Sequence, residues 1–287
     1  MVNNRMMKKI VNYILAVVLF SSCTYEDYLN DFDTTTVYFS FQNPVRTLIV
    51  DEYEYIKLGV ALGGKRENKQ NEWAKFEVDS ELLQNTRFKL LPSDVYTLSN
   101  TEEIVIPEGK MQGDVTVNFD MDKLTSMSEP YTNYALPVRI TSTSLDQVHA
   151  EKDYTIIAFK YIAHLDGTWY HKGTTKAINL NTDSTWTRIY SKPTLEKNQS
   201  WTLNTKTSQM VETNGISYLS GKMEIDQQAE EIFITAEEEE NFHSKSASMS
   251  ADKKELYLSY SFQRDSIVYE ATDTLIFATR NIVFETW

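Results

Sequence analysis

The sequence has very little cysteine, proline and glycine, and it is short of positive charge. Its 287 residues include 1 cysteine, 6 prolines and 9 glycines. A single cysteine excludes a disulfide framework within the chain and a cluster of thiolates around zinc. Proline and glycine are too scarce for a collagen-like or disordered Gly/Pro-rich chain. The net charge of −13 argues against a general nucleic-acid binder, which needs clustered Lys and Arg.

Aromatic residues, by contrast, are plentiful. The chain has 5 tryptophans, 17 tyrosines and 13 phenylalanines, enough to bury a sizeable core. At about 150 residues per domain, the length favours two domains.

The first 22 residues have the pattern of a signal peptide. Three basic residues (Arg5, Lys8 and Lys9) precede an apolar stretch over 10–20. That stretch is too short for a membrane-spanning helix, which needs about 20 residues, but it suits a signal-peptide core. Small residues then lead to Cys23, and the segment 19–23 resembles a bacterial lipobox. The resemblance implies cleavage before Cys23 and lipidation of its thiol; the alternative is an incidental small apolar residue.

Residues 23–33 are polar and acidic, and we expect them to form a lipidated tether. Acidic residues directly after Cys23 resemble the surface-export signal of Bacteroides-type lipoproteins. The expected location is therefore the outer membrane, anchored by lipid and facing the cell surface. The acidic protein would be repelled by anionic head groups, so the lipid would have to hold it there.

Apolar residues alternate with polar ones through most of residues 34–161. Clear runs of this kind lie at 37–41, 56–62, 115–119, 134–140 and 154–159. Alternation is the signature of half-buried strands, and turn residues separate the runs. About seven such strands suit an immunoglobulin-like β-sandwich. One short helix is predicted over 120–127.

Residues 164–287 form a second set of alternating segments. We predict strands at 184–190, 208–212, 216–225, 231–236, 255–262 and 273–279, with a hairpin turn at Thr213–Gly215. About eight strands joined by hairpins suit a small up-and-down barrel.

The order of these parts resembles lipoproteins of Bacteroides-type glycan-utilisation loci. The N-terminal half resembles an immunoglobulin-like domain of unknown function through residues 53–60, 104–109 and 134–140. In the C-terminal half, Gly167-Thr168-Trp169 resembles the Gly-x-Trp that opens lipocalin-like domains, where the tryptophan plugs one barrel end. The resemblance implies an all-β chain, with an immunoglobulin-like β-sandwich over 34–161 and a lipocalin-like antiparallel β-barrel over 164–287. It also implies a surface binding protein that works beside a glycan importer, a conclusion by association.

Three tryptophans are candidate contacts for a carbohydrate ligand. A sugar ring offers apolar C–H patches that pack on rigid aromatic faces. Trp186 and Trp201 have polar neighbours, and Trp73 lies in a highly charged stretch, so exposure is plausible for all three. Ordinary half-buried packing is the alternative for each. Trp169 is expected in the core.

Local motifs for catalysis or metal binding are lacking. Carboxylate pairs such as Asp120 and Asp122, or Glu102 and Glu103, arise by chance among 41 acids. We interpret Glu237–Glu240 as a solvated loop rather than a calcium site. No histidine spacing suits a metal site, so we expect neither a metal nor a cofactor. Because no catalytic motif is visible, we also do not expect the protein to be an enzyme.

The hypothesis from sequence is a lipid-anchored surface protein that binds a polysaccharide without cleaving it. Its expected partners are the outer membrane through Cys23, a carbohydrate, and an importer or other surface proteins of a glycan locus. One alternative is a protein-partner or assembly module with no sugar binding. A barrel pocket for a small apolar molecule and a glycosidase remain as further alternatives.

Overall fold

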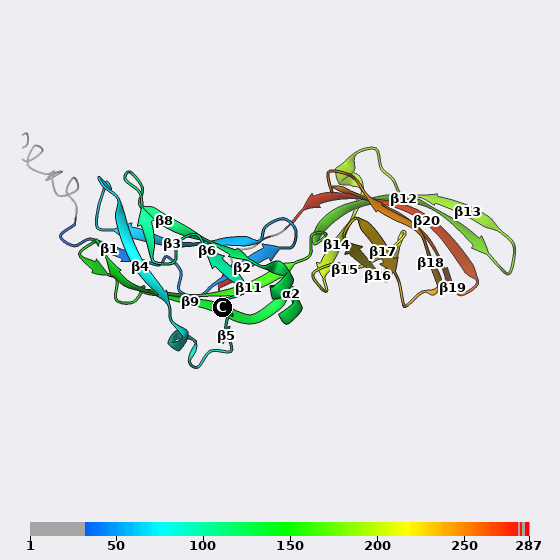
Figure 1. Ribbon diagram of the computed structural model, residues 1–287. Helices are drawn as coiled ribbons and strands as arrows, with labels where there is room; N and C mark the ends of the chain where they lie inside the picture. Colours follow the sequence, from blue (N-terminus) through cyan, green and yellow to red (C-terminus); the bar gives the residue numbers. More distant parts are fainter. Residues whose placement is uncertain (1–31, 281, 283–284, 287) are drawn as a thin grey trace, which may run out of the picture.

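The computed structural model describes residues 32–280, 282 and 285–286, and it is almost entirely β-structure (Figure 1). The predicted lipidation site, Cys23, and the signal peptide lie outside the described residues. Two lobes follow each other along the chain, a sandwich of two sheets and a single curled sheet. None of the described helices is both long and apolar enough to cross a membrane.

The sandwich is built from two sheets that pack face to face. The first sheet has the order β10-β1-β3-β8-β6, and the second has β21-β2-β11-β9-β4-β7 with β5 added to β9. Their strands are β1 (Thr36–Tyr38), β2 (Pro44–Ile49), β3 (Tyr55–Gly63), β4 (Glu72–Val78), β5 (Lys89–Leu90), β6 (Tyr96–Leu98), β7 (Glu103–Ile106), β8 (Gln112–Phe119), β9 (Tyr131–Thr143), β10 (Gln147–Val148), β11 (Tyr154–Ile162) and β21 (Glu285–Thr286).

The alternating residues of the sandwich point into one apolar core. Leu58 of β3 and Val117 of β8 are fully buried there, as the period-two pattern predicts. The predicted short helix is present as α2 (Met121–Met127), and a one-turn 3-10 helix, η2 (Ser80–Leu83), follows β4. The Asp120 carboxylate caps α2 by accepting from the backbone N–H of Lys123.

The second lobe is one antiparallel sheet of nine strands that curls nearly into a barrel. Its order is β17-β16-β15-β14-β12-β20-β19-β18, with β13 also paired to β12. The two strands at the ends of this order, β17 and β18, also contact each other, so the sheet closes on itself almost completely; we call it the near-barrel. Its elements are β12 (Gly167–Asn179), β13 (Thr185–Ile189), η3 (Leu195–Lys197), β14 (Gln199–Thr205), β15 (Met210–Ile216), β16 (Leu219–Gln228), β17 (Glu231–Thr235), β18 (Glu240–Met249), β19 (Glu255–Arg264) and β20 (Ile267–Thr279).

Trp169 is buried at the start of β12, as expected. Its indole N–H donates to the carbonyl of Leu165 at 3.0 Å. Gly167 makes this entry possible, because its φ is +143° and a Cβ there would lie 2.8 Å from the carbonyl oxygen of Thr279. The Gly-x-Trp segment is therefore explained by packing at one end of the near-barrel.

The predicted hairpin at Thr213–Gly215 is wrong. β15 runs through these residues with a bulge, and the chain turns at Ser217 and Tyr218 instead. Gly215 is required for a different reason: a Cβ there would collide with the indole of Trp201. The glycine marks a close packing contact rather than a turn.

The chain crosses between the lobes twice, which differs from the expectation that 164–287 forms one unit. Residues 285–286 form β21 and pair with β2 of the sandwich. The Lys160 ammonium of β11 bonds the Glu285 carboxylate. Between the lobes, the Arg280 guanidinium donates to the carbonyls of Asp166 and His164 and to the Glu52 carboxylate.

Candidate functional site

One end of the near-barrel carries a row of aromatic side chains on its inner face. Trp186 of β13 pairs with Ala177 of β12, and Ala177 pairs with Tyr269 of β20. Paired residues in antiparallel strands point to the same side of a sheet. Because Ala177 is buried in the core, Trp186 and Tyr269 also lie on the inner face. The β12–β13 hairpin points away from the sandwich, so this row lies at the end remote from it (Figure 1).

Tyr218, the second tyrosine of this site after Tyr269, comes from the turn between β15 and β16. Tyr218 lies between Tyr190 and Tyr269, with ring centroids 5.9 Å and 6.3 Å away. The Arg188 guanidinium carbon lies 4.4 Å from the centre of the Tyr218 ring, a cation–π contact. We call Trp186, Arg188, Tyr190, Tyr218 and Tyr269 the distal cradle.

The Tyr218 hairpin is fixed by hydrogen bonds at its tip. Ser217 adopts a φ of +53°, a conformation usually taken by glycine. Its backbone N–H donates to the Tyr260 hydroxyl at 2.6 Å, and its own hydroxyl lies 2.6 Å from that of Thr175. Tyr218 is thus positioned by the core and not only by its own turn.

A buried polar network lies beneath the cradle and centres on Asp273, which is 1% exposed. One carboxylate oxygen accepts from the Tyr260 hydroxyl at 2.5 Å. The other accepts from the Tyr190 hydroxyl and lies 3.2 Å from Nε2 of His171. Burial, and then the Asp273 charge, raise the pKa values of Tyr190 and Tyr260 above the ordinary tyrosine value. Both phenols therefore remain protonated donors at neutral pH.

His171 completes this network on the side facing Trp201. Its imidazole stacks on the Trp201 ring with centroids 3.8 Å apart, and its exposed fraction is 0%. Gly173 leaves the space for Asp273, since a Cβ there would collide with the carboxylate. His171 and Asp273 are both sealed from solvent. They therefore form a buried support that holds Tyr190, and with it the cradle, in place.

The three predicted tryptophans do not form one site. Trp186 is 40% exposed in the distal cradle. Trp201 is only 5% exposed, so the expectation that it faces solvent is wrong. Trp73 is half-buried on β4 of the sandwich, in the other lobe, with the Lys75 ammonium 5.7 Å from its ring centre. Ligand contact remains a prediction for Trp73 and Trp186.

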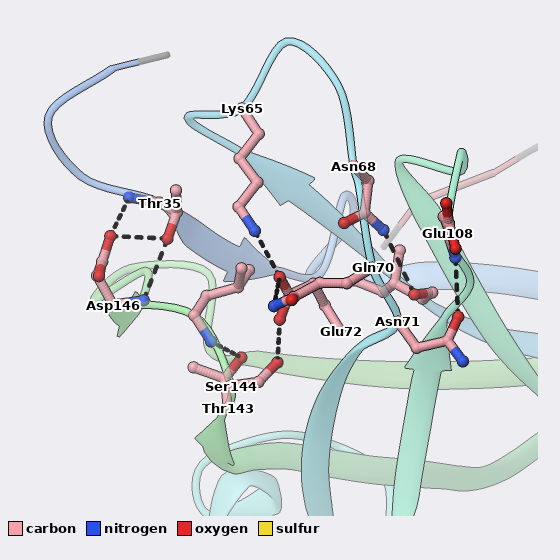
Figure 2. A network of polar contacts seen from close by, with 12 residues as sticks. Thr35, Lys65, Asn68, Gln70, Asn71, Glu72, Glu108, Thr143, Ser144 and Asp146 are labelled. Carbon is pink, nitrogen blue, oxygen red and sulfur yellow. Dashed lines mark hydrogen bonds and ion pairs between the residues drawn. The ribbon is translucent and has the colours of Figure 1, made fainter.

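A second polar cluster joins loops of the sandwich (Figure 2). The buried Glu72 carboxylate accepts from the Lys65 ammonium, from Gln70 at 3.0 Å and from the Ser144 hydroxyl at 2.6 Å. Burial would raise the pKa of Glu72, but these bonds outweigh burial and hold the pKa below its ordinary value. The cluster fastens the β3–β4 loop to the chain after β9.

The acidic run at 237–240 forms the predicted exposed loop between β17 and β18 at three of its four residues, and Glu239 is the exception. Glu239 is buried and accepts from Nε of Arg264 at 2.7 Å in a two-point ion pair. Sequence reasoning missed this pair because the partner lies on another strand. No three His, Cys, Asp or Glu side chains within the described ranges are grouped to hold a metal ion.

The fold and this site together define a two-lobed, all-β protein with an aromatic cradle at one end. A family model described as an N-terminal domain matches residues 32–147, which correspond to most of the sandwich. A search of curated proteins finds no match.

Among solved structures, the chain is similar to a protein of unknown function from Bacteroides ovatus. The two are 20% identical with a TM-score of 0.68, over 90% of this chain and 98% of the other. The likeness shows that the whole two-lobed fold recurs. An auxiliary nutrient binding protein from Bacteroides thetaiotaomicron is 15% identical with a TM-score of 0.37, over 80% and 89% of the two chains. That second likeness is too slight to argue from.

Proposed function

We propose that the protein binds a polysaccharide, without cleaving it, through the distal cradle of the near-barrel. It would be held at the outer-membrane surface by lipid on Cys23 and would work beside a glycan importer. The sandwich then serves as a spacer that carries the cradle away from the membrane.

The observation that carries the proposal is the placement of Trp186. A large ring that is 40% exposed on the concave face of a sheet offers a flat apolar platform open to solvent. The half-buried Tyr218 extends this surface, the buried Tyr269 supports Tyr218 from below, and the Arg188 guanidinium supplies hydrogen-bond donors beside it. A sugar-binding site needs both an apolar surface and hydrogen-bonding groups, because sugar rings have apolar faces and hydroxyl edges.

Binding rather than hydrolysis suits the groups at the cradle surface. Glycosidases use two carboxyl groups that flank the scissile bond. The acid nearest the cradle, Asp273, is sealed below Tyr190 and already accepts from two phenols. It is therefore occupied in positioning the rings.

The test is calorimetry and affinity gels with the full chain in detergent against a panel of polysaccharides. We expect one polymer class to bind without release of reducing sugar. Trp186→Ala should weaken that binding at least about tenfold, since a hot-spot ring contributes roughly 2 kcal/mol or more. The matched control is Trp73→Ala in the sandwich, which should bind normally. Loss of binding in the Trp73 variant alone would move the site to the sandwich and contradict the proposal.

Lipid anchoring is tested separately. Cys23→Ala should leave the protein out of the outer-membrane fraction, and protease added to whole cells should digest the wild-type protein. A Cys23 variant that remains in the membrane fraction would contradict anchoring by this residue.

A protein-binding role is the second candidate, and the free edge of β13 favours it. β13 pairs only with β12 among the described strands, and all five of its residues are exposed. An open strand edge can accept a strand from another protein. Thr187→Pro on that edge would abolish binding to an importer component but leave Trp186 and polysaccharide binding in place.

A further inference from the structure

A small cavity, partly open to solvent, lies between the two lobes and is separate from the distal cradle. Its volume is about 140 Å³, and both lobes line it. The sandwich contributes the turn after β2 and the start of α2, including Asp51, Glu54 and Asp122. The near-barrel contributes His164 and the turns beside β15 and β16, including Gln227.

Two buried polar atoms at this cavity have no hydrogen-bond partner. The side-chain oxygen of Gln227 is one, and the residue is only 9% exposed. The second is Nδ1 of His164, whose closest carboxylate oxygen, on Glu52, is 3.6 Å away. A buried acceptor without a donor costs free energy, so such atoms in a native fold point to a missing partner.

The charged groups that line the cavity are all acidic. Asp51, Glu54 and Asp122 bring carboxylates to it, and no Lys or Arg is among its lining residues. Burial, followed by the nearby Lys253, lowers the pKa of His164, so its imidazole is neutral at pH 7. The complementary ligand is therefore a cation that donates hydrogen bonds.

A metal ion is not the best occupant. The acids do not converge, since no three carboxylate or imidazole groups of the described residues are grouped for metal binding. A primary ammonium fits better, because its three N–H donors can reach acceptors that lie apart. The volume equals about four or five water molecules at about 30 Å³ each, so the ligand is a small one.

We propose that this cavity binds a small primary amine through its ammonium group. The Gln227 oxygen and the Asp51 carboxylate would accept from the ammonium, one from each lobe. The bound amine would then join the lobes at a point where the protein alone leaves acceptors unpaired. This site is independent of polysaccharide binding at the cradle.

The test is calorimetry with the full chain in detergent and two matched probe sets. The first is ethanolamine against N-acetylethanolamine, and the second is glucosamine against N-acetylglucosamine. In each set acetylation removes the positive charge and keeps the hydroxyl groups. We expect at least one free amine to bind one-to-one, at least about tenfold more tightly than its acetylated form. Which amine binds decides between an amino alcohol and an amino sugar.

Two variants assign the binding to this cavity. Gln227→Leu removes the unpaired oxygen, and Asp51→Asn removes one charge while keeping a residue that tolerates the Asp51 φ of +61°. Each should weaken amine binding at least about tenfold. The control, Asp94→Asn, makes the same charge change at an exposed position outside the cavity and should bind as the wild type does.

Three results would overturn the proposal. They are no binding of either free amine, equal binding of the free and acetylated forms, and unchanged affinity in the Asp51 variant. Absence of binding would indicate that the cavity holds only ordered water. Equal binding of both forms would show that the ammonium is not recognised, and an unchanged Asp51 variant would show that the amine binds elsewhere. Polysaccharide binding measured on the same samples keeps the cradle proposal separate.

Discussion

The two lobes differ in the kind of side chain that they bury. The sandwich fills its centre with aliphatic and aromatic side chains and keeps its main polar network, around Glu72, at the loops. The near-barrel buries a carboxylate, an imidazole and two phenols among its strands. A substitution in an apolar core lowers stability in proportion to the volume removed. In a buried polar network, removal of one acceptor leaves several donors unpaired at once, so the loss of stability is larger. The near-barrel is therefore the lobe whose geometry is fixed most strictly, and it carries the cradle.

The largest expected effect comes from breaking the near-barrel network. Asp273→Ala should lower the free energy of unfolding by about 4 kcal/mol, because the phenols of Tyr190 and Tyr260 lose their acceptor in a closed core and His171 loses the carboxylate beside it. Urea unfolding followed by tryptophan fluorescence measures this, since Trp169 and Trp201 lie in that core. The exposed Asp114→Ala is the control. A loss under about 1 kcal/mol would mean that the network is not a unit.

A comparable change in the sandwich should cost somewhat less and behave differently. Leu58→Ala leaves a cavity in an apolar core and should cost about 3 kcal/mol. The loss should be the same at pH 6 and pH 8 and at low and high salt, because no charged group is involved. Urea unfolding followed by circular dichroism measures it, and a strong dependence on pH would contradict the contrast between the lobes.

Separating the lobes should have an intermediate effect. Arg280→Ala removes bonds to the carbonyls of Asp166 and His164 and to Glu52, and it should cost about 2 kcal/mol. Differential scanning calorimetry should then show two separated transitions. The exposed Arg87→Ala is the control. A single transition with an unchanged midpoint would show that the lobes are coupled by other contacts.

The smallest effect is expected at the polar loops of the sandwich. Glu72→Gln should cost about 1 kcal/mol at pH 7 through weaker bonds to Lys65 and Ser144. The folded-state pKa of Glu72 is lowered, so its contribution is present above the unfolded value of about 4.3 and is lost as pH falls through the folded value. Urea midpoints from pH 7 to pH 3 should converge for the two proteins. Midpoints that stay apart at pH 3 would contradict this origin.

Sequence patterns predicted the β-rich fold because alternation is local. The pattern failed where a strand buries few apolar residues. β18 is rich in serine and has no fully buried residue, so its alternation is weak and is confined to Ala247 and Met249, which pack partly against the core. β14 was missed for a similar reason, since only Trp201 and Leu203 of its seven residues are buried. β21 could not be predicted, because its partner β2 lies at the other end of the chain.

The site was predictable only in part. The exposure of Trp186 followed from its polar neighbours, but the same signal was misleading at Trp201. The network could not be assembled because His171 and Asp273 lie on strands far apart in sequence, joined only by the register of β12 and β20. The available signal was a polar residue at an inward position of an otherwise apolar strand, as at Asp273 between Ala271 and Leu275.

The return of the chain to the sandwich has a mechanical consequence. A lobe attached by one segment can swing and twist about that segment in any direction. The near-barrel is attached by two, one leaving at β11 and one returning at β21, and two fixed points leave rotation about a single axis. Tension applied along the chain between β1 and β21 would load the sandwich first. The two-residue ladder between β2 and β21 would peel before any strand of the near-barrel is pulled, so the cradle keeps its shape while the protein is under strain.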